Sequence, residues 1–498
     1  MVNREPMQNT GRLSSFMTPS ARRILFGETA NTAIENDLEH ACYVDRAHLV
    51  MLAERGIVDA AHAVQLLQGI DELEESDFSA LRGKPAPRGL YLLYESYLME
   101  RLGAHIGGVL QTARSRNDLN ATVLMLRLRR PYRELVRQSL RLQAVLLRRA
   151  RQYSAVTMPA YTHYQAALPV SYGHYLAGIA AALDRDIAAL FEAGACLKRC
   201  SLGAGAVGGT SLPIDPVRTA SLLGFDESPL NSIDAVASRD VVIRLLSAAT
   251  VMGVTLSRLA NDFLLWTTSE FGFILLPDDL VGSSSMMPQK RNPFVLEHVL
   301  GRSAAPLGGF VAAATAMHGT PFSNSIAVGT EAVSHIWKNL QSIIEAVTLA
   351  RLVIDGAAPQ AEEMIRRATE GFTCATELAN RLMKEGGVAF RAAHHTVGAI
   401  VRDAIERGES LDRAAGPQLE AAGYTVSLAG LDPAAVAAAS PFGGGPAVES
   451  INASVAVLKK RWQGYCDRIR VDEKKWQTAR ANLSEAISNL AAAREARN

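Results

Sequence analysis

The chain has 498 residues, of which 51 are lysine or arginine and 50 are aspartate or glutamate, and its formal net charge is +1. A charge balance this close to zero argues against nucleic-acid binding and against membrane-surface binding as the main role. The length allows two or three domains, and the hydrophobic fraction of 48% is sufficient for a large core.

The N-terminal residues and the cysteines predict the compartment. Residues 1–20 are polar and lack the apolar segment of a secretory signal. No stretch of about 18 uncharged apolar residues is present, so we expect no membrane-spanning helix. The five cysteines are sparse and odd in number, which is typical of a reduced cytoplasmic protein. Cys196 and Cys200 have no metal-site partner nearby in the sequence, so we expect buried structural thiols.

Helical periodicity runs along almost the whole chain, because alanine, leucine, arginine and glutamate dominate and β-branched alternation is rare. Long helices are expected over residues 119–152, 168–200, 234–272, 294–316 and 330–355. Pro131 either starts a segment or kinks the first of these helices. Helices of this length favour an all-α fold built around a long bundle, in which each helix buries most of its surface.

Breaks in the helical pattern divide the chain into three predicted domains. They are an N-terminal helical domain at 1–112, a central long-helix domain at 113–361 and a C-terminal helical domain at 362–498. Clusters of glycine, proline and serine mark loops at 202–213, 281–293 and 319–325. Residues 464–498 are charged and amphipathic, and they predict a docking helix.

The first long helix is rich in arginine. The arginines are Arg127, Arg129, Arg130, Arg133, Arg137, Arg141, Arg148, Arg149 and Arg151. Such a run resembles a nucleic-acid stripe in composition, but the positions scatter around the helix instead of following one face. We therefore expect a solvated or subunit-facing surface.

The stretch from Gly282 to Pro293 is the most informative part of the chain. It contains three consecutive serines, Lys290 and Asn292 between two predicted helices. Flexible backbone with free N–H groups suits a lid that wraps an anion, and Lys290 and Asn292 add a positive charge and two donors. This chemistry fits the stabilisation of a carboxylate that gains charge during a reaction. The alternative is an ordinary polar loop between helices.

A second group of polar residues, Thr112 to Asp118, opens the first long helix. Two arginines, a serine and an asparagine lie within it. N–H groups at a helix N-terminus and guanidinium groups both bind carboxylates, so an anion site is one interpretation. An N-capped helix with surface arginines is the other, and spacing alone favours it.

A third segment, Tyr161 to Gln165, places His163 among hydrogen-bonding side chains just before a predicted helix. A histidine in such a loop can act as an acid or a base, or can orient one. A lone histidine is more often structural. Glu297 follows the serine-rich loop, and it could hold the imidazole in one tautomer.

Together the three segments resemble those of the fumarase/aspartase superfamily. The serine-rich loop is similar to its signature, glycine-serine-serine-x-methionine-proline-x-lysine-x-asparagine-proline. The arginine-serine-arginine-asparagine-aspartate run ending at Asp118 and the tyrosine-threonine-histidine run starting at Tyr161 resemble the argininosuccinate lyase branch, which includes ethylenediamine-disuccinate lyases. Further similar stretches begin at Leu202, Asn231 and Phe390, so the resemblance covers roughly residues 40–455.

The resemblance implies an all-α homotetramer around a core of twenty long helices. It implies active sites that each take one segment from three different subunits. Members eliminate fumarate from a succinyl-bearing small molecule, by anti elimination through an aci-carboxylate, without a metal or an organic cofactor. No nucleic acid and no membrane take part.

The resemblance also implies roles for individual residues. Ser284 would abstract the proton, although Ser283 stands where the family has glycine and the alignment could slip by one residue. His163 and Glu297 would orient the site or relay the proton to the leaving amine. Residues that would bind the substrate are Thr112, Ser115, Arg116, Asn117, Thr162, Gln165, Lys290 and Asn292.

The match fails where the branch recognises arginine. Argininosuccinate lyases use tyrosine, glutamine and lysine in a stretch that corresponds to residues 319–331 here, and none of the three occurs in it. Gly89-Leu90-Tyr91 replaces an aspartate-x-histidine run. Gln111 and Ala113 replace a histidine and a glycine. Each lost partner of a buried polar group costs about 1–3 kcal/mol, so arginine recognition would be crippled.

Three functions follow from these residues. The first is a carbon–nitrogen lyase that acts on an N-substituted aspartate other than argininosuccinate, or adds an amine to fumarate in reverse. The second is an ordinary argininosuccinate lyase with a rebuilt arginine pocket. The third is a non-catalytic relative such as a lens protein, but the joint presence of Ser284, Lys290, Asn292, His163 and Glu297 argues against it.

Overall fold

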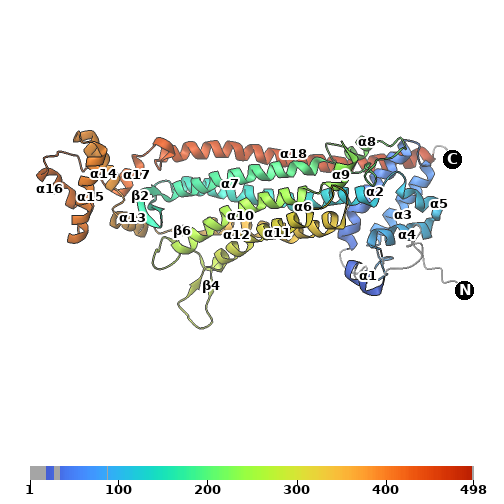
Figure 1. The fold of residues 1–498 in the computed structure, drawn as a ribbon, viewed down its shortest axis with the longest axis horizontal. Helices are drawn as coiled ribbons and strands as arrows, with labels where there is room; N and C mark the ends of the chain where they lie inside the picture. The colour runs from blue at the N-terminus through green and yellow to red at the C-terminus, as the bar shows by residue number, and fades with distance from the viewer. Residues whose placement is uncertain (1–17, 27–33, 87, 496–498) are drawn as a thin grey trace.

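The computed structural model describes residues 18–26, 34–86 and 88–495. Among them are eighteen α-helices and only short strands, which confirms the all-α prediction. The expectation for residues 1–20 lies almost entirely outside the described residues. Figure 1 shows an elongated molecule in which helices from the N-terminal, central and C-terminal parts of the chain follow one another along one axis.

The N-terminal part is a small helical unit with its own core. Its elements are α1 (Pro19–Phe26), α2 (Ile34–Glu54), α3 (Ala60–Glu75), α4 (Leu90–Leu102), α5 (Ala104–Gly107) and the 3-10 helix η1 (Gly108–Gln111). Leu49, Leu66, Ile70, Tyr94 and Leu98 are fully buried within it. Asp59 caps α3 by accepting the backbone N–H of Ala61 at 2.7 Å, which satisfies one of the free amides at that helix end.

Five long helices form the central bundle. They are α6 (Arg116–Gln152), α7 (Tyr172–Gly194), α10 (Val241–Trp266), α11 (Phe294–Met317) and α12 (Ala332–Gly356). Close helix packing depends on small residues, because a Cβ atom added at Gly253 of α10 would lie 2.2 Å from the carbonyl oxygen of Ser303 in α11. Pro131 lies inside α6, so the prediction that it starts a separate segment is wrong, whereas the predicted kink stays a prediction. A long helix can contain a proline where its neighbours hold both halves in place.

The chain between these helices forms short elements that carry most of the polar segments. The helical ones are η2 (Ala195–Lys198), α8 (Pro216–Leu222), α9 (Ser232–Ala237), η3 (Asp278–Leu280) and the π-helical turn η4 (Ala327–Glu331). The strands β3 (Ile274–Leu275) and β6 (Ala358–Pro359) pair with each other in antiparallel fashion.

A β-hairpin stands where the sequence predicted the start of a helix. Strand β1 (Thr157–Thr162) pairs with β2 (Gln165–Ser171), and α7 begins only at Tyr172. The prediction of a helix over 168–200 is therefore wrong for its first residues. Pro159 and Pro169 lie opposite each other, and proline donates no hydrogen bond and disfavours a helix interior.

The C-terminal part begins with a cluster of short helices, within the stretch where the sequence predicted a C-terminal helical domain. They are α13 (Ala361–Glu370), α14 (Ala375–Glu385), α15 (Phe390–Arg407), α16 (Leu411–Ala421), α17 (Pro433–Ala438) and η5 (Phe442–Gly444). Buried Leu378, Leu382 and Ile400 lie in a core of their own. The division into three domains, with boundaries at 112 and 361, stays a prediction.

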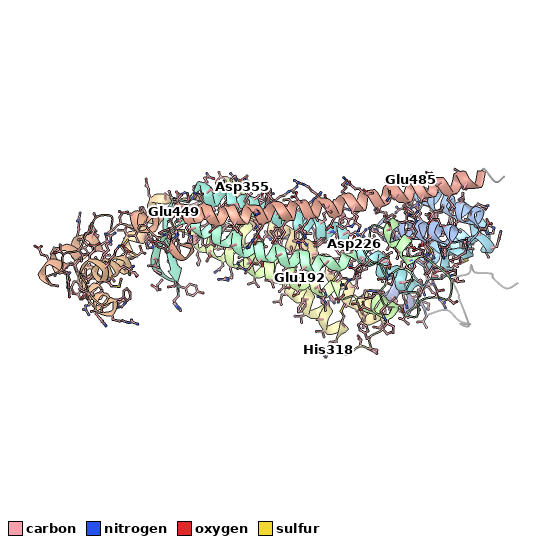
Figure 2. All side chains as sticks on the ribbon, turned by 90° about the horizontal axis from the view of Figure 1, so that it is seen from above. Glu192, Asp226, His318, Asp355, Glu449 and Glu485 are labelled. Carbon is pink, nitrogen blue, oxygen red and sulfur yellow. The ribbon has the colours of Figure 1, made fainter. Side chains whose placement is uncertain are left out.

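The last helix, α18 (Val448–Glu495), is far longer than the predicted docking helix at 464–498. It returns along α6 and α7 and reaches α2 and α3. Figure 2 shows this course, with Glu449 and Glu485 marking its two ends. Helix α18 thus joins the C-terminal helices to the N-terminal unit.

The arginines of α6 form only part of the solvated or subunit-facing surface that the sequence predicted, because Arg130, Arg141, Arg148 and Arg151 are exposed whereas others are buried. Arg129 and Arg149 are buried, at 8% and 7% exposure. Arg129 donates to the carbonyl oxygens of Leu223 and Gly224, at 2.8 and 3.0 Å, and its guanidinium faces Trp476 of α18. Arg137 pairs with Glu473 of α18 at 2.7 Å. Arg129 and Arg137 thus hold α18 against the bundle.

Helix α10 is apolar enough to cross a membrane by composition alone, with a mean hydropathy of 1.4 in its most apolar window. Half of that window is buried inside the protein. Helices α7, α11 and α12 pack against it. A buried core helix passes the same compositional test, and the packing favours that interpretation.

Candidate active site

The serine-rich loop projects from the side of the bundle on two short strands (Figure 1). Strand β4 (Gly282–Ser283) pairs with β5 (Arg291–Asn292), so that Gly282 lies opposite Asn292. A Cβ atom at Gly282 would lie 2.2 Å from the ring of Phe294, so a larger residue there would have to displace that ring. Arg291 donates to the carbonyl oxygen of Leu276 at 2.7 Å and pairs with Asp278. The base of the loop is therefore fixed while its tip is exposed.

Within this loop, Ser284 has a distinct environment. Its Oγ accepts the backbone N–H groups of Met286 and Met287, at 3.3 and 3.0 Å. Ser283 belongs to strand β4. Two donors aimed at one oxygen favour negative charge on it. Lys290 is exposed and Asn292 is half-buried on the same loop.

The segment before α6 is organised by buried Asp118. Ser115 is the N-cap of α6 and accepts the N–H of Asn117 at 3.2 Å, while Asp118 accepts the N–H of Ser115 at 2.9 Å. Asp118 also accepts the N–H groups of Gly203 and Gly205, at 3.1 and 2.9 Å. Burial raises the pKa of Asp118, and these three backbone donors oppose the rise. One carboxylate thus ties two loops together.

Arg114 lies in the core and not on the surface that the sequence suggested. It forms an ion pair with Asp45 at 2.6 Å, and both side chains are fully buried. Tyr91 donates to Asp45 at 3.3 Å and accepts a bond from Arg114. Burial raises the pKa of Asp45, whereas Arg114 lowers it. Tyr91, Asp45 and Arg114 thus form one network of polar contacts. Tyr91 belongs to the stretch that replaces the aspartate-x-histidine run of the resembled branch.

His48 supports the same segment from helix α2. Its Nε2 donates to the carbonyl oxygen of Thr112 at 2.8 Å. Burial, assisted by the nearby charge of Arg114, lowers the pKa of His48 to about 3. The imidazole is therefore neutral near pH 7. Sequence reasoning missed His48 and Asp45, because no local motif links them to residues more than sixty positions away.

Asn117 meets the stretch that the sequence associates with the amine half of the substrate. Asn324 donates to its Oδ1 at 3.0 Å, and its own Nδ2 lies 3.4 Å from the carbonyl oxygen of Ala206. Asn324 of this stretch therefore lies beside the start of α6. Thr112 is half-buried and Arg116 is exposed in the same place. Sequence reasoning had not singled out Asn324, because a surface asparagine in a loop carries no local signal.

His163 occupies the tip of the β1–β2 hairpin. Thr162 and Gln165 pair across it, and the two residues between them, His163 and Tyr164, have φ values of 51° and 62°. Positive φ at both central positions defines a type I′ turn, in which glycine or asparagine is usual. Non-glycine residues in this region cost about 1–3 kcal/mol and cluster at functional sites. Thr162, His163 and Gln165 are all exposed.

One chain does not bring the three segments together. Helix α6 has 37 residues and separates Ser115 from the hairpin, a length of about 55 Å at 1.5 Å per residue. Helix α11 has 24 residues and separates Ser284 from Asn324 by about 36 Å in the same way. Among the described residues, no hydrogen bond joins His163 to exposed Glu297. A complete site would need residues from more than one chain.

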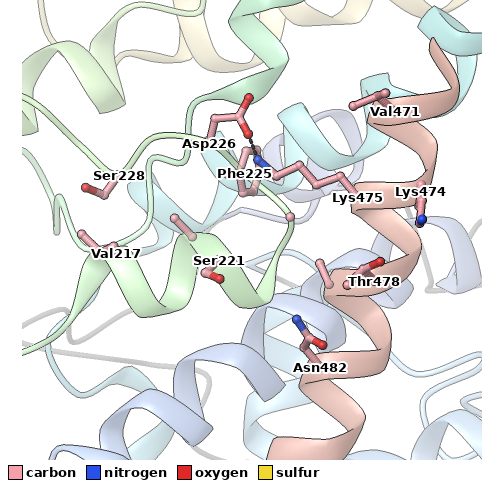
Figure 3. A pocket seen from close by; sticks show the side chains of 13 residues that line it. Val217, Ser221, Phe225, Asp226, Ser228, Val471, Lys474, Lys475, Thr478 and Asn482 are labelled. Carbon is pink, nitrogen blue, oxygen red and sulfur yellow. Dashed lines mark ion pairs between the residues drawn. The ribbon is translucent and has the colours of Figure 1, made fainter. Parts of the chain in front are cut away.

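Two cavities in the described part of the chain lie away from most of these residues. Figure 3 shows one of about 540 Å³ between α8 and α18, where Lys475 pairs with Asp226. It contains none of the predicted site residues. A second, of about 450 Å³, lies under the hairpin and is lined by Tyr161, Tyr164 and Trp266. It borders the His163 turn and none of the other segments.

Comparison with known protein families supports the resemblance that the three segments indicate. A lyase family model matches residues 39–308, and an argininosuccinate lyase C-terminal model matches residues 372–438. The argininosuccinate lyase of Methanoculleus marisnigri is 36% identical over 422 residues, which cover 83% of this chain and 85% of that protein. The argininosuccinate lyase of Thermus thermophilus is 35% identical over 370 residues, 74% of this chain and 79% of that one.

Solved structures give the same result. EDDS lyase in complex with formate superimposes with a TM-score of 0.83 at 27% identity, covering 96% of both chains. A 3-carboxy-cis,cis-muconate lactonizing enzyme from Pseudomonas putida shares the fold, with a TM-score of 0.67 at 19% identity. The chain therefore belongs to the fumarase/aspartase superfamily of lyases. Within it, the protein is a carbon–nitrogen lyase of the argininosuccinate lyase type.

Proposed function

We propose that the enzyme eliminates fumarate from an N-substituted L-aspartate other than argininosuccinate, and that in reverse it adds an amine to fumarate. The observation that carries this proposal is the position of Asn324, within residues 319–331, beside Asn117. That stretch contains no tyrosine, glutamine or lysine. The similarity to EDDS lyase over 96% of the chain supports a substrate whose amine half is not arginine.

The proposed chemistry begins at Ser284. Its Oγ takes the proton from the carbon next to a carboxylate, and the electron pair moves into that carboxylate to give an aci-carboxylate. The carbon–nitrogen bond then breaks, so that fumarate forms and the amine leaves with a proton. The two N–H groups that Oγ accepts support its role as base. Lys290 and Asn292 stabilise the charge that gathers on the carboxylate.

Residues of the other two segments bind the rest of the succinyl group in this proposal. Thr112, Ser115, Arg116 and Asn117 approach from the start of α6. Thr162 and Gln165 approach from the hairpin, where His163, oriented by Glu297, returns a proton to the leaving amine. The positive φ of His163 and its exposure on a lone chain support a function at this tip.

We also propose that the enzyme is a homotetramer with shared sites. Val251 and Val254 of α10 and Leu307 and Val311 of α11 are more than half exposed on the isolated chain. Apolar side chains on long bundle helices favour association with further copies. In a single chain, the length of α6 separates the β1–β2 hairpin from the start of α6. Two copies packed side by side in opposite directions would place the hairpin of one chain next to the start of α6 in the other.

A cytoplasmic location fits the cysteines. Cys42, Cys196, Cys200 and Cys374 are buried free thiols. Burial raises the pKa of Cys200 to about 12. Unpaired cysteines are typical of a reducing compartment.

The proposal is tested by mixing the purified protein with fumarate and a panel of diamines and amino acids, and following the ultraviolet absorbance of fumarate. We expect fumarate to be consumed with at least one amine. The Ser284→Ala variant, under the same conditions, controls for contaminating lyases. No consumption with any amine, together with release of fumarate from argininosuccinate, would contradict the proposal.

Argininosuccinate lyase itself is the second candidate. Its support is the 36% identity to the Methanoculleus marisnigri enzyme over 83% of this chain. Growth of an arginine auxotroph that lacks its own argininosuccinate lyase separates the two candidates. Growth restored by this chain, and not by its Ser284→Ala variant, would favour argininosuccinate.

A further inference from the structure

The amide of Asn324 lies against the amide of Asn117, although the two residues are 207 positions apart. We infer that Asn324 is a positioning residue, which fixes the orientation of the Asn117 amide for the succinyl half of the substrate. This inference rests on the proposed function and adds a residue to it. The inferred role concerns the succinyl half of the substrate, because Asn324 acts through Asn117. It does not concern recognition of the amine half.

The contacts around Asn117 set which end of its amide remains for a ligand. Its Oδ1 accepts from Asn324 at 3.0 Å, and its backbone carbonyl oxygen lies 3.4 Å from a guanidinium nitrogen of Arg239. Its Nδ2 has one weak contact, 3.4 Å from the carbonyl oxygen of Ala206. An amide nitrogen carries two N–H donors. One donor therefore remains for a substrate carboxylate.

Without Asn324, the Asn117 amide would lose the hydrogen bond that fixes its orientation. A free amide can rotate and present Oδ1 to the carboxylate, and two acceptors facing each other repel. The bond from Asn324 occupies Oδ1 and prevents that rotation. Asn324 thus decides whether Asn117 donates or accepts at the site.

A hydrogen-bonded turn follows Asn324 directly in the chain. Gly329 donates its backbone N–H to the carbonyl oxygen of Ser325 at 2.8 Å, at the start of the π-helical turn η4. A Cβ atom added at Gly329 would make an ordinary van der Waals contact, at 3.4 Å, with Oδ1 of Asn324, so the turn lies beside this amide. Both asparagines are half-buried, and a half-buried amide bond is shielded from competing water.

The test measures fumarate binding and turnover in Asn324→Asp and Asn324→Ala. A carboxylate at position 324 has no donor, so the Asn117 amide must turn its Nδ2 away from the substrate. We expect Asn324→Asp to weaken fumarate binding and to lower kcat/KM by about tenfold or more, equally for every amine. Asn324→Ala only frees the amide to rotate, so we expect a smaller loss.

Two comparisons exclude a merely structural effect. Asn452→Asp makes the same chemical change at an exposed position of α18 and should leave kcat/KM unchanged. In the background of Asn117→Ala, Asn324→Asp should cause no further loss, because the group that it orients is gone. The Tm of each variant, measured alongside, shows whether it folds.

The outcomes separate this inference from the proposed function. The role of Asn324 would be overturned if Asn324→Asp lowered kcat/KM as much in the Asn117→Ala background as in the wild type. It would also be overturned if Asn324→Asp alone behaved like the wild type. Either result would leave the lyase proposal intact. A wild-type protein that neither binds fumarate nor consumes it with any amine would overturn both.

Discussion

At the scale of single residues, the two adjacent serines of the loop have different environments. The Oγ of Ser284 accepts two backbone N–H groups, whereas Ser283 lies in a strand opposite Arg291. We therefore expect Ser284→Ala to lower kcat by a factor of about a thousand or more with little change in Tm. Ser283→Ala is the matched control and should retain most activity. The reverse pattern would mean that Ser283 is the base.

The backbone conformation of Ala113 leads to a second prediction. It has a φ of 60°, a left-handed value, at a position where the resembled branch has glycine. Glycine adopts this conformation without steric cost, whereas alanine does not. We expect Ala113→Gly to raise the free energy of unfolding by about 0.5–1 kcal/mol, because relief of strain exceeds the added flexibility of the unfolded chain. Chemical denaturation measures it, and a lower stability would contradict the strain.

At the scale of elements, helix α2 holds the segment before α6 through neutral His48. Its pKa is about 3 in the folded chain against an ordinary value of 6.5. Between these two values the unfolded chain binds more protons, so the free energy of unfolding falls as the pH decreases. We expect His48 to account for a loss of about 2 kcal/mol between about pH 7 and pH 5.

The variant His48→Gln isolates this contribution. Glutamine can still donate to the carbonyl oxygen of Thr112, but it does not titrate. Denaturation curves at both pH values should therefore differ less for the variant than for the wild type. An equal pH dependence of the two proteins would show that other groups cause the loss.

The elements also show how much of the fold and of the candidate site could be predicted from the sequence. Motifs placed Ser284 and His163 on loops and Ser115 at the opening of a long helix, and the structure has all three in these places. The hairpin was missed because a type I′ turn through His163 and Tyr164 lacks the glycine that usually marks it. The buried state of Arg114 was missed because Asp45 and Tyr91 are distant in the sequence. Local patterns report a residue's type and spacing, whereas burial is a tertiary property.

At the scale of the whole molecule, the length of α6 and α11 makes a single chain incapable of assembling the proposed site. If sites are shared, two inactive variants should complement each other. Mixing Ser284→Ala and His163→Asn subunits by denaturation and renaturation should restore about a quarter of wild-type activity, since one site in four receives both intact residues. Each variant, renatured alone, is the control. No recovery in the mixture would contradict sharing.

The substrate is the central claim, and one assay tests it most directly. Purified enzyme is mixed with argininosuccinate, and fumarate release is followed against the Ser284→Ala variant. We predict no release above that background, because residues 319–331 contain no tyrosine, glutamine or lysine to bind the arginine half. Release at an ordinary enzymatic rate, about 1–1,000 per second, would contradict the account and identify an argininosuccinate lyase.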